Sequence, residues 1–333
     1  MAAPTTATFT KKDFQSNQEV RWCPGCGDYA ILAAVQAVFP KLGVPREKFV
    51  VVSGIGCSSR FPYYMNTYGF HTIHGRAPTV ATGIKLADPS LSVWVVTGDG
   101  DGLSIGGNHL MHALRRNVGV KVLLFNNRIY GLTKGQYSPT SEAGKRTKST
   151  PFGSVDHPLN PLRIALGAEA TFVANAVDRY PQELQATLSE AAEHEGGAFV
   201  HIFQNCNIFN DGAFDHFTER AVREDANLFL EPGRPMVFGK GRSKGLRWTG
   251  FGFDVIPLGH EAGFTEADCA VHDPSNLMYA YGLALLQEPP TGVVPIGVLY
   301  RKPRESFEQA VRGQMQAHRP GDTSPDLAAL LLG

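Results

Sequence analysis

The sequence lacks a hydrophobic run long enough to cross a bilayer. A transmembrane helix needs roughly 20 consecutive apolar residues, and no stretch of the 333 residues reaches that length. The N-terminal stretch MAAPTTATFTKKDF also lacks the apolar core of a signal peptide. We therefore expect a cytoplasmic protein that does not bind membranes.

An excess of charge is missing as well. The 31 Lys and Arg residues balance the 31 Asp and Glu residues, so no global field favours nucleic acid or an anionic lipid surface. With 43% hydrophobic and 19% charged residues, the composition is that of an ordinary globular protein. We expect one large domain or two modest ones, and no nucleic-acid partner.

Cysteine is scarce, and its placement is uneven. Disulfides are disfavoured in the cytoplasm, so the five cysteines indicate metal binding or catalysis. Cys23 and Cys26 form a Cys-x-x-Cys motif, which alone is ambiguous between zinc, a redox dithiol and an iron–sulfur site. Cys57 and Cys206 each follow an apolar strand-like run. Cys269 has no partner motif and is interpreted as an inert buried residue.

The chain is organised around a strand–helix–strand unit. Val93–Thr97 and Val120–Phe125 are apolar, β-branched runs typical of buried parallel strands, and Ile105–Arg116 between them has helical spacing. Gly98-Asp99-Gly100-Asp101 follows the first strand and Asn126-Asn127 follows the second. Both clusters therefore lie at the edge of the sheet where open α/β folds bind ligands.

These residue types suit a hard cation that holds a diphosphate. Glycine lets the backbone approach phosphate, and Asp and Asn supply the oxygen ligands that Mg²⁺ or Ca²⁺ favours. The alternative is a Gly/Asp-rich turn with an Asn helix cap. A dinucleotide site at Gly54-x-Gly56 is disfavoured because the third glycine is missing. His74 and Arg76, beside a helix start, suit phosphate better than zinc.

The remaining segments continue an α/β alternation. Asp28 is predicted to cap a helix that ends at Pro40, and further elements are predicted at 49–53, 78–87, 160–166, 170–173, 181–194 and 199–203. A Ser/Thr/Gly-rich loop of about 25 residues after Gln136 is long enough to be functional, as a lid or a partner contact. Residues 1–20 are interpreted as an N-terminal arm. Residues 207–333 are interpreted as an extended C-terminal arm that packs on the core or on a partner.

Five motifs in order carry a resemblance to a known family. They are WCPGCG, GIGCSSR, HTIHGRA, GDGD followed by NN, and YGLTKGQ with Ser138-Pro139-Thr140. The set resembles the β subunit of 2-oxoacid:ferredoxin oxidoreductases, over most of residues 20–210. The resemblance implies an α/β fold of the thiamine diphosphate (ThDP)-binding type, with a mostly parallel sheet flanked by helices.

The resemblance also implies site residues. Asp99, Asn127 and the carbonyl of Ile129 would bind Mg²⁺. Cys23, Cys26, Cys57 and Cys206 would hold one [4Fe–4S] cluster, with a structural zinc on the same four cysteines as the alternative. The residues that would contact the cofactors are Ile55, Gly56, Cys57, Ser58, His74, Gly98, Gly100, Asp101, Gly131 and Leu132.

The implied reaction is the reversible, CoA-dependent oxidative decarboxylation of a 2-oxoacid, with one-electron transfer through the cluster to ferredoxin. The Gly54–Gly83 segment most resembles the members that use 2-oxoglutarate, and pyruvate is the alternative substrate. Arg60 is the candidate partner for a substrate carboxylate. Lys134 departs from the glycine that many relatives have there, so its role is open. The rivals are a non-catalytic iron–sulfur interaction subunit and a ThDP decarboxylase without a cluster.

A partner subunit is also implied. In the family, the Glu beside the ThDP aminopyrimidine lies on a separate pyrimidine-binding domain, and this sequence shows no second α/β domain to carry it. The resemblance therefore implies an α subunit that supplies this domain and the CoA site, in an αβ or (αβ)₂ assembly. On its own the chain is expected to be inactive.

Overall fold

The protein is described here from a computed structural model that covers residues 9–318, except 262 and 288–290. Within these residues the central feature is an eight-stranded sheet in the order β2-β1-β3-β4-β6-β5-β11-β7. Its strands are β1 (Phe49–Ser53), β2 (Tyr68–His71), β3 (Ser92–Gly98), β4 (Val120–Asn126), β5 (Phe172–Val177), β6 (Ala198–Phe203), β7 (Asn227–Phe229) and β11 (Val294–Arg301). Neighbouring strands run parallel except at the β5–β11 pair, which is antiparallel.

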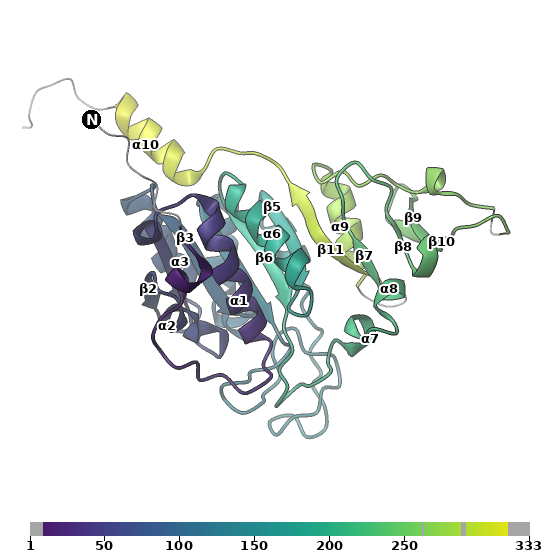
Figure 1. The fold of residues 1–333 in the computed structure, drawn as a ribbon, viewed down its shortest axis with the longest axis horizontal. Helices are drawn as coiled ribbons and strands as arrows, with labels where there is room; N and C mark the ends of the chain where they lie inside the picture. Colours follow the sequence, from purple (N-terminus) through teal and green to yellow (C-terminus); the bar gives the residue numbers. More distant parts are fainter. Residues whose placement is uncertain (1–8, 262, 288–290, 319–333) are drawn as a thin grey trace, which may run out of the picture.

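Helices cover both faces of this sheet, and smaller elements flank it (Figure 1). The helices are α1 (Asp28–Val38), α2 (Phe61–Tyr64), α3 (Ala77–Ala87), α4 (Gly107–Arg115), α5 (Pro161–Gly167), α6 (Pro181–Glu193), α7 (Asp215–Thr218), α8 (Arg223–Ala226), α9 (Leu277–Leu285) and α10 (Phe307–Ala317). A separate antiparallel sheet contains β8 (Val237–Phe238), β9 (Lys244–Trp248) and β10 (Phe253–Pro257). None of the described helices is both long and apolar enough to cross a membrane.

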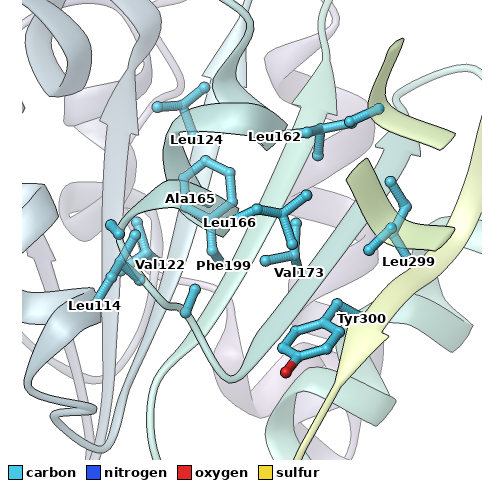
Figure 2. Packing of buried hydrophobic residues seen from close by; sticks show 14 of the residues in the cluster. Leu114, Val122, Leu124, Leu162, Ala165, Leu166, Val173, Phe199, Leu299 and Tyr300 are labelled. Atoms are coloured by element: carbon cyan, nitrogen blue, oxygen red, sulfur yellow. The ribbon is translucent and has the colours of Figure 1, made fainter. Parts of the chain in front are cut away.

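The strand sequences are apolar on both faces because both faces are covered. In β1, Val50 and Val52 belong to one hydrophobic cluster, and Phe49 and Val51 belong to the other. This alternation is the period of two expected of a strand. The first cluster packs against α3, α4, α5 and α9, and Figure 2 shows Leu162, Ala165 and Leu166 of α5 beside Phe199 and Val173 of the sheet. The second cluster packs against α1 and α6.

The predicted strand–helix–strand unit is present with small changes at its helix. The strands are β3 and β4, and the helix α4 begins at Gly107, after a π-helical turn over Asp101–Ile105. Asp28 differs from its predicted role, because it is the first residue of α1 and Gly27 holds the cap position. The Cys23–Cys26 turn runs directly into this helix, with Tyr29 N–H donating to the Cys26 carbonyl at 3.2 Å, so Asp28 is buried inside the first turn.

Both predicted arms pack on the core in the part of the chain that the structure describes. Residues Lys11–Phe14 form a 3₁₀ turn, and Phe14 is fully buried against Phe39 and Phe49. In the C-terminal part, β7 and β11 complete the main sheet, so this part is not an extended arm as far as it is described. Val294–Arg301 is an apolar strand whose partner in the sheet, β5, lies more than 100 residues earlier.

Candidate active site

Three strand ends converge on one cavity at the carboxyl edge of the sheet. The loops after β1, β3 and β4 surround a space of about 90 Å³, which we call the strand-end cavity. In Figure 1 the long loops that follow β4 lie below this edge of the sheet. The lining includes every residue predicted to contact ThDP or Mg²⁺: Ile55, Gly56, Cys57, Ser58, His74, Gly98, Asp99, Gly100, Asp101, Asn127, Ile129, Gly131 and Leu132.

Asp99 is held from one side by the loop that follows β4. Its Oδ2 accepts hydrogen bonds from Ser138 Oγ at 2.5 Å and from Thr140 Oγ1 at 2.6 Å. Burial raises the pKa of the Asp99 carboxyl, and the two hydroxyl donors oppose that shift. Both hydroxyls use Oδ2, so neither of them occupies Oδ1, and a cation bound to the carboxylate would keep it ionised.

A buried network of neutral groups is connected to Asp99 through Thr140. Thr140 Oγ1 lies 2.8 Å from Asn126 Oδ1, and Asn126 Nδ2 lies 2.9 Å from His201 Nε2. His201 Nδ1 in turn lies 2.7 Å from Asn175 Oδ1. Burial lowers the pKa of His201 to about 3, so the imidazole is neutral at physiological pH. The groups that surround Asp99 in this network are therefore neutral hydrogen-bond partners.

Asn127 is fixed by its own turn. Its Oδ1 accepts from the Ile129 N–H at 3.1 Å, and its Nδ2 donates to Gln204 Oε1 at 2.8 Å. The side chain can therefore present only its oxygen to a cation near Ile129. Together with Asp99, these residues form an oxygen set of one carboxylate, one amide and one backbone carbonyl, which is chemistry that Mg²⁺ prefers.

Asp101 lies in the wall of the strand-end cavity and is held by several hydrogen bonds. Its Oδ1 accepts from the N–H groups of Gly75 at 2.7 Å and Ile55 at 3.1 Å, and its Oδ2 accepts from Thr97 Oγ1 at 2.6 Å. His74 Nδ1 lies 2.6 Å from Oδ1. The carboxylate thus ties the backbones of Ile55 and Gly75 to the end of β3 and so helps to shape the cavity that Asp101 lines.

The structure explains why two positions of the cavity wall are glycine. Gly56 has φ +124°, a backbone conformation that residues with a side chain rarely adopt. At Gly100, a Cβ atom would lie 2.2 Å from the ring of Tyr130, whose hydroxyl donates to the Gly100 carbonyl at 3.0 Å. A side chain at either position would deform the cavity wall.

The four predicted cluster cysteines line a second cavity. Cys23, Cys26, Cys57 and Cys206, all unpaired, surround a space of about 220 Å³, which we call the cysteine cavity. A Cβ atom at Gly131 would lie 3.6 Å from the sulfurs of both Cys57 and Cys206. Residues separated by more than 140 positions therefore meet at one place.

The environment of Cys26 and Cys57 disfavours the free ionised forms of these two thiols. Burial raises the pKa of Cys57 to about 12, and negative charge on Asp28 and Cys206 adds to the shift. Burial also raises the pKa of Cys26, again with Asp28 adding to it. Thiolates are stable in such a place only when a cationic group binds them. Within the described residues, no three His, Cys, Asp or Glu side chains are arranged to hold a single metal ion.

The two cavities share a wall. Cys57, Asn127, Gly131 and Leu132 line both of them. Arg60 lines the cysteine cavity and also a third, outer cavity of about 540 Å³, to which Tyr63 and His71 contribute. Arg60 Nη1 donates to the Arg21 carbonyl at 3.4 Å. The guanidinium is thus placed where a molecule that enters beside Gly56 and Leu132 would meet it.

Three residues that contact the predicted metal ligands were not among the predicted site residues. Ser138 and Thr140 belong to a motif of the resemblance, but their hydroxyls gave no sign of reaching Asp99 across about 40 residues of sequence. Gln204 follows β6 and lies two positions before Cys206 in the sequence. That proximity was the one sequence signal that it could lie near the site.

Comparisons with known proteins agree with this geometry. Residues 54–202 match the family model described as the thiamine pyrophosphate enzyme C-terminal TPP binding domain. The chain is 54% identical over 319 residues to 2-oxoglutarate oxidoreductase subunit KorB of Mycobacterium tuberculosis, covering 95% of this chain and 84% of that protein. It is 48% identical over 190 residues to subunit beta of 2-oxoacid:ferredoxin oxidoreductase 1 of Aeropyrum pernix, covering 57% of this chain and 60% of that one.

A solved structure extends the likeness to the fold. It is 2-oxoglutarate:ferredoxin oxidoreductase from Magnetococcus marinus with 2-oxoglutarate, coenzyme A and succinyl-CoA bound. The match has a TM-score of 0.79 and 34% sequence identity, and it covers 98% of this chain and 97% of that chain. Both the sequence match along nearly the whole chain and the shared fold lead to one assignment: the chain belongs to the β subunits of the 2-oxoacid:ferredoxin oxidoreductases.

Proposed function

We propose that this chain is the β subunit of a CoA-dependent 2-oxoglutarate:ferredoxin oxidoreductase. The reaction converts 2-oxoglutarate and CoA to succinyl-CoA and CO₂ and passes the electrons to ferredoxin. The observation that carries the proposal is the wall shared by the strand-end cavity and the cysteine cavity. A site with ThDP-type ligands and a site with four cysteines stand side by side in one chain.

The strand-end cavity fits Mg²⁺ and the diphosphate of ThDP. Asp99, Asn127 and the carbonyl of Ile129 would supply three oxygen ligands, and the diphosphate and water would complete the coordination. When bound, ThDP supplies the electron sink that lets a 2-oxoacid lose CO₂. The chain's own contribution is to fix the ligands: Ser138 and Thr140 hold Asp99, and the turn at Ile129 holds Asn127.

The cysteine cavity fits a [4Fe–4S] cluster better than a zinc ion. Zinc draws its thiolates to about 2.3 Å from one point. The four cysteines instead surround a space of about 220 Å³, and no three potential ligands in the described chain are placed for a single ion. A cluster fills such a space and accepts four thiolates.

The exposed surface near the strand-end cavity supports a partner subunit. Tyr68 and Phe70 on the edge strand β2 are 64% and 49% exposed, and Ile73 in the loop that follows is 71% exposed. Large apolar side chains grouped beside a site mark a surface that another protein covers. We propose that an α subunit covers it, supplies the pyrimidine-binding domain and CoA site, and forms an αβ or (αβ)₂ assembly.

The test is an anaerobic assay of the chain co-expressed with its candidate α subunit. We expect 2-oxoglutarate to reduce ferredoxin or a viologen dye only when CoA is present, and faster than pyruvate does. A preference for pyruvate would change the assigned substrate but leave the proposed class of reaction unchanged. No reduction by any 2-oxoacid, despite bound ThDP and four irons per chain, would favour the non-catalytic interaction subunit.

Replacing Arg60 by alanine should reduce the selectivity for a dicarboxylic substrate. A hydrogen bond to a charged group contributes about 1.5–3 kcal/mol, so kcat/KM for 2-oxoglutarate should fall about 10- to 100-fold more than kcat/KM for pyruvate. Arg46→Ala is the matched control, since Arg46 donates to the Asp13 carbonyl and lines none of the three cavities. An equal loss for both substrates in Arg60→Ala would contradict a role in substrate binding.

A further inference from the structure

Gln204 connects the two candidate cofactor sites through one side chain. It is 1% exposed and follows directly after β6. Its Oε1 accepts from Asn127 Nδ2 at 2.8 Å, and its Nε2 donates to Cys26 Sγ at 3.3 Å and to the Asn205 carbonyl at 2.6 Å. One buried amide therefore contacts a candidate ligand of the cation and a candidate ligand of the cluster.

The orientation of this amide is fixed from both ends. The Ile129 N–H can only donate, so the Asn127 atom 3.1 Å from it is Oδ1, and Nδ2 faces the oxygen of Gln204. The Asn205 carbonyl can only accept, so the Gln204 atom 2.6 Å from it is Nε2. The second N–H of that nitrogen then points to Cys26 Sγ. Reversing either amide would place two donors or two acceptors against each other.

From this arrangement we propose that Gln204 is a positioning residue for both cofactors. It turns the oxygen of Asn127 toward the cation, and it donates an N–H···S hydrogen bond to the Cys26 thiolate of the cluster. The inference deepens the proposed function and depends on its assignment of the two cavities. It adds a residue of the cysteine cavity wall that acts on the two sites through Asn127 and Cys26.

The expected effect on the cluster follows from charge. A cluster becomes more negative when it is reduced, so a hydrogen-bond donor on one of its sulfurs stabilises the reduced form and raises the reduction potential. The effect is strong here because the donor is buried, where water cannot replace it. The expected effect on the cation follows from geometry, since a residue that orients a metal ligand typically changes metal affinity by about 10- to 100-fold.

Two substitutions separate these effects in the assembled enzyme. Gln204→Glu keeps an oxygen that accepts from Asn127 and replaces the amide donor to Cys26. Gln204→Leu removes both contacts at similar size. Gln182→Leu is the control, because Gln182 lies exposed in the first turn of α6. The readouts are the midpoint potential of the cluster, from an anaerobic redox titration followed by EPR, and the ThDP retained after dialysis at graded Mg²⁺ concentrations.

We expect the midpoint potential of the cluster to be about 59 mV lower in both variants. This shift corresponds to about a tenfold change in the equilibrium constant of one-electron reduction. ThDP retention should stay close to wild type in Gln204→Glu and should require about tenfold more Mg²⁺ in Gln204→Leu. Unchanged potentials at full iron content would overturn the proposal that Gln204 donates a hydrogen bond to a cluster ligand. Equal ThDP retention in the two variants would overturn the link to Asn127.

Two further outcomes are also decisive. If Gln204→Leu loses its iron, an unchanged potential in the nearly isosteric Gln204→Glu at full iron content overturns the cluster half of the proposal. If the wild-type complex holds neither four irons nor ThDP, the proposed function fails and this inference fails with it. A wild type with both cofactors whose variants show no shift overturns the inference alone.

Discussion

Replacing Asp99 by asparagine should lower the affinity of the assembled enzyme for Mg²⁺ and ThDP at least about 100-fold. Loss of a residue that only supports a metal ligand costs about 10- to 100-fold, and Asp99 is the one carboxylate in the proposed oxygen set. The amide keeps an oxygen for the hydroxyls of Ser138 and Thr140, so the loop should stay in place. Fluorescence titration with ThDP at graded Mg²⁺ concentrations measures the change.

Asp156→Asn is the matched control for this substitution. Asp156 lies in the long loop after β4 that also holds Ser138 and Thr140, is exposed, and accepts a hydrogen bond from the Tyr137 hydroxyl at 2.8 Å. Its replacement should leave both affinities unchanged. If Asp99→Asn also binds ThDP with the wild-type dependence on Mg²⁺, the metal ligands lie elsewhere.

Replacing Cys206 by alanine should remove the cluster and leave ThDP bound. Cys206 lines the cysteine cavity and not the strand-end cavity, so the loss of its thiolate should affect one cofactor only. We expect the iron content to fall from four per chain to less than about one, since the variant loses one of the four thiolates proposed to hold the cluster. ThDP content, measured on the same sample, should remain close to that of wild type.

Cys269→Ala separates this effect from a general loss of thiols. Cys269 is buried in another part of the chain, beside Gly245, and its replacement should leave the iron content unchanged. Full iron content in Cys206→Ala would remove this residue from the ligand set. One zinc per chain and no iron in anaerobically prepared wild type would restore the zinc alternative.

The parts of the fold that were predictable depend on local pattern. The β3 and β4 runs are continuous and apolar because both faces of the sheet are covered, and such runs are recognisable without knowledge of the rest of the chain. Asp99 and Asn127 come at the ends of these strands, so the topology alone brings them to the same edge. The residues predicted to line the site do meet there.

The parts that were not predictable depend on distant contacts. Phe14 occurs in a polar stretch without periodicity, yet it fills a pocket between Phe39 and Phe49. The strand β11 adds to the sheet from the far end of the chain, antiparallel to β5. Gln204 owes its proposed role to hydrogen bonds with Asn127 and Cys26, which lie 77 and 178 positions away in the sequence. No local signal in the sequence encodes such pairs.

We propose that one chain holds both the site of decarboxylation and the first electron acceptor, on the two sides of the wall shared by the strand-end cavity and the cysteine cavity. The most direct measurement adds 2-oxoglutarate anaerobically to the assembled enzyme without ferredoxin or dye and records the EPR spectrum. We predict that the signal of the reduced cluster appears with substrate alone and accounts for one electron per chain. A cluster that stays oxidised with 2-oxoglutarate, yet is reduced by dithionite, would contradict the account.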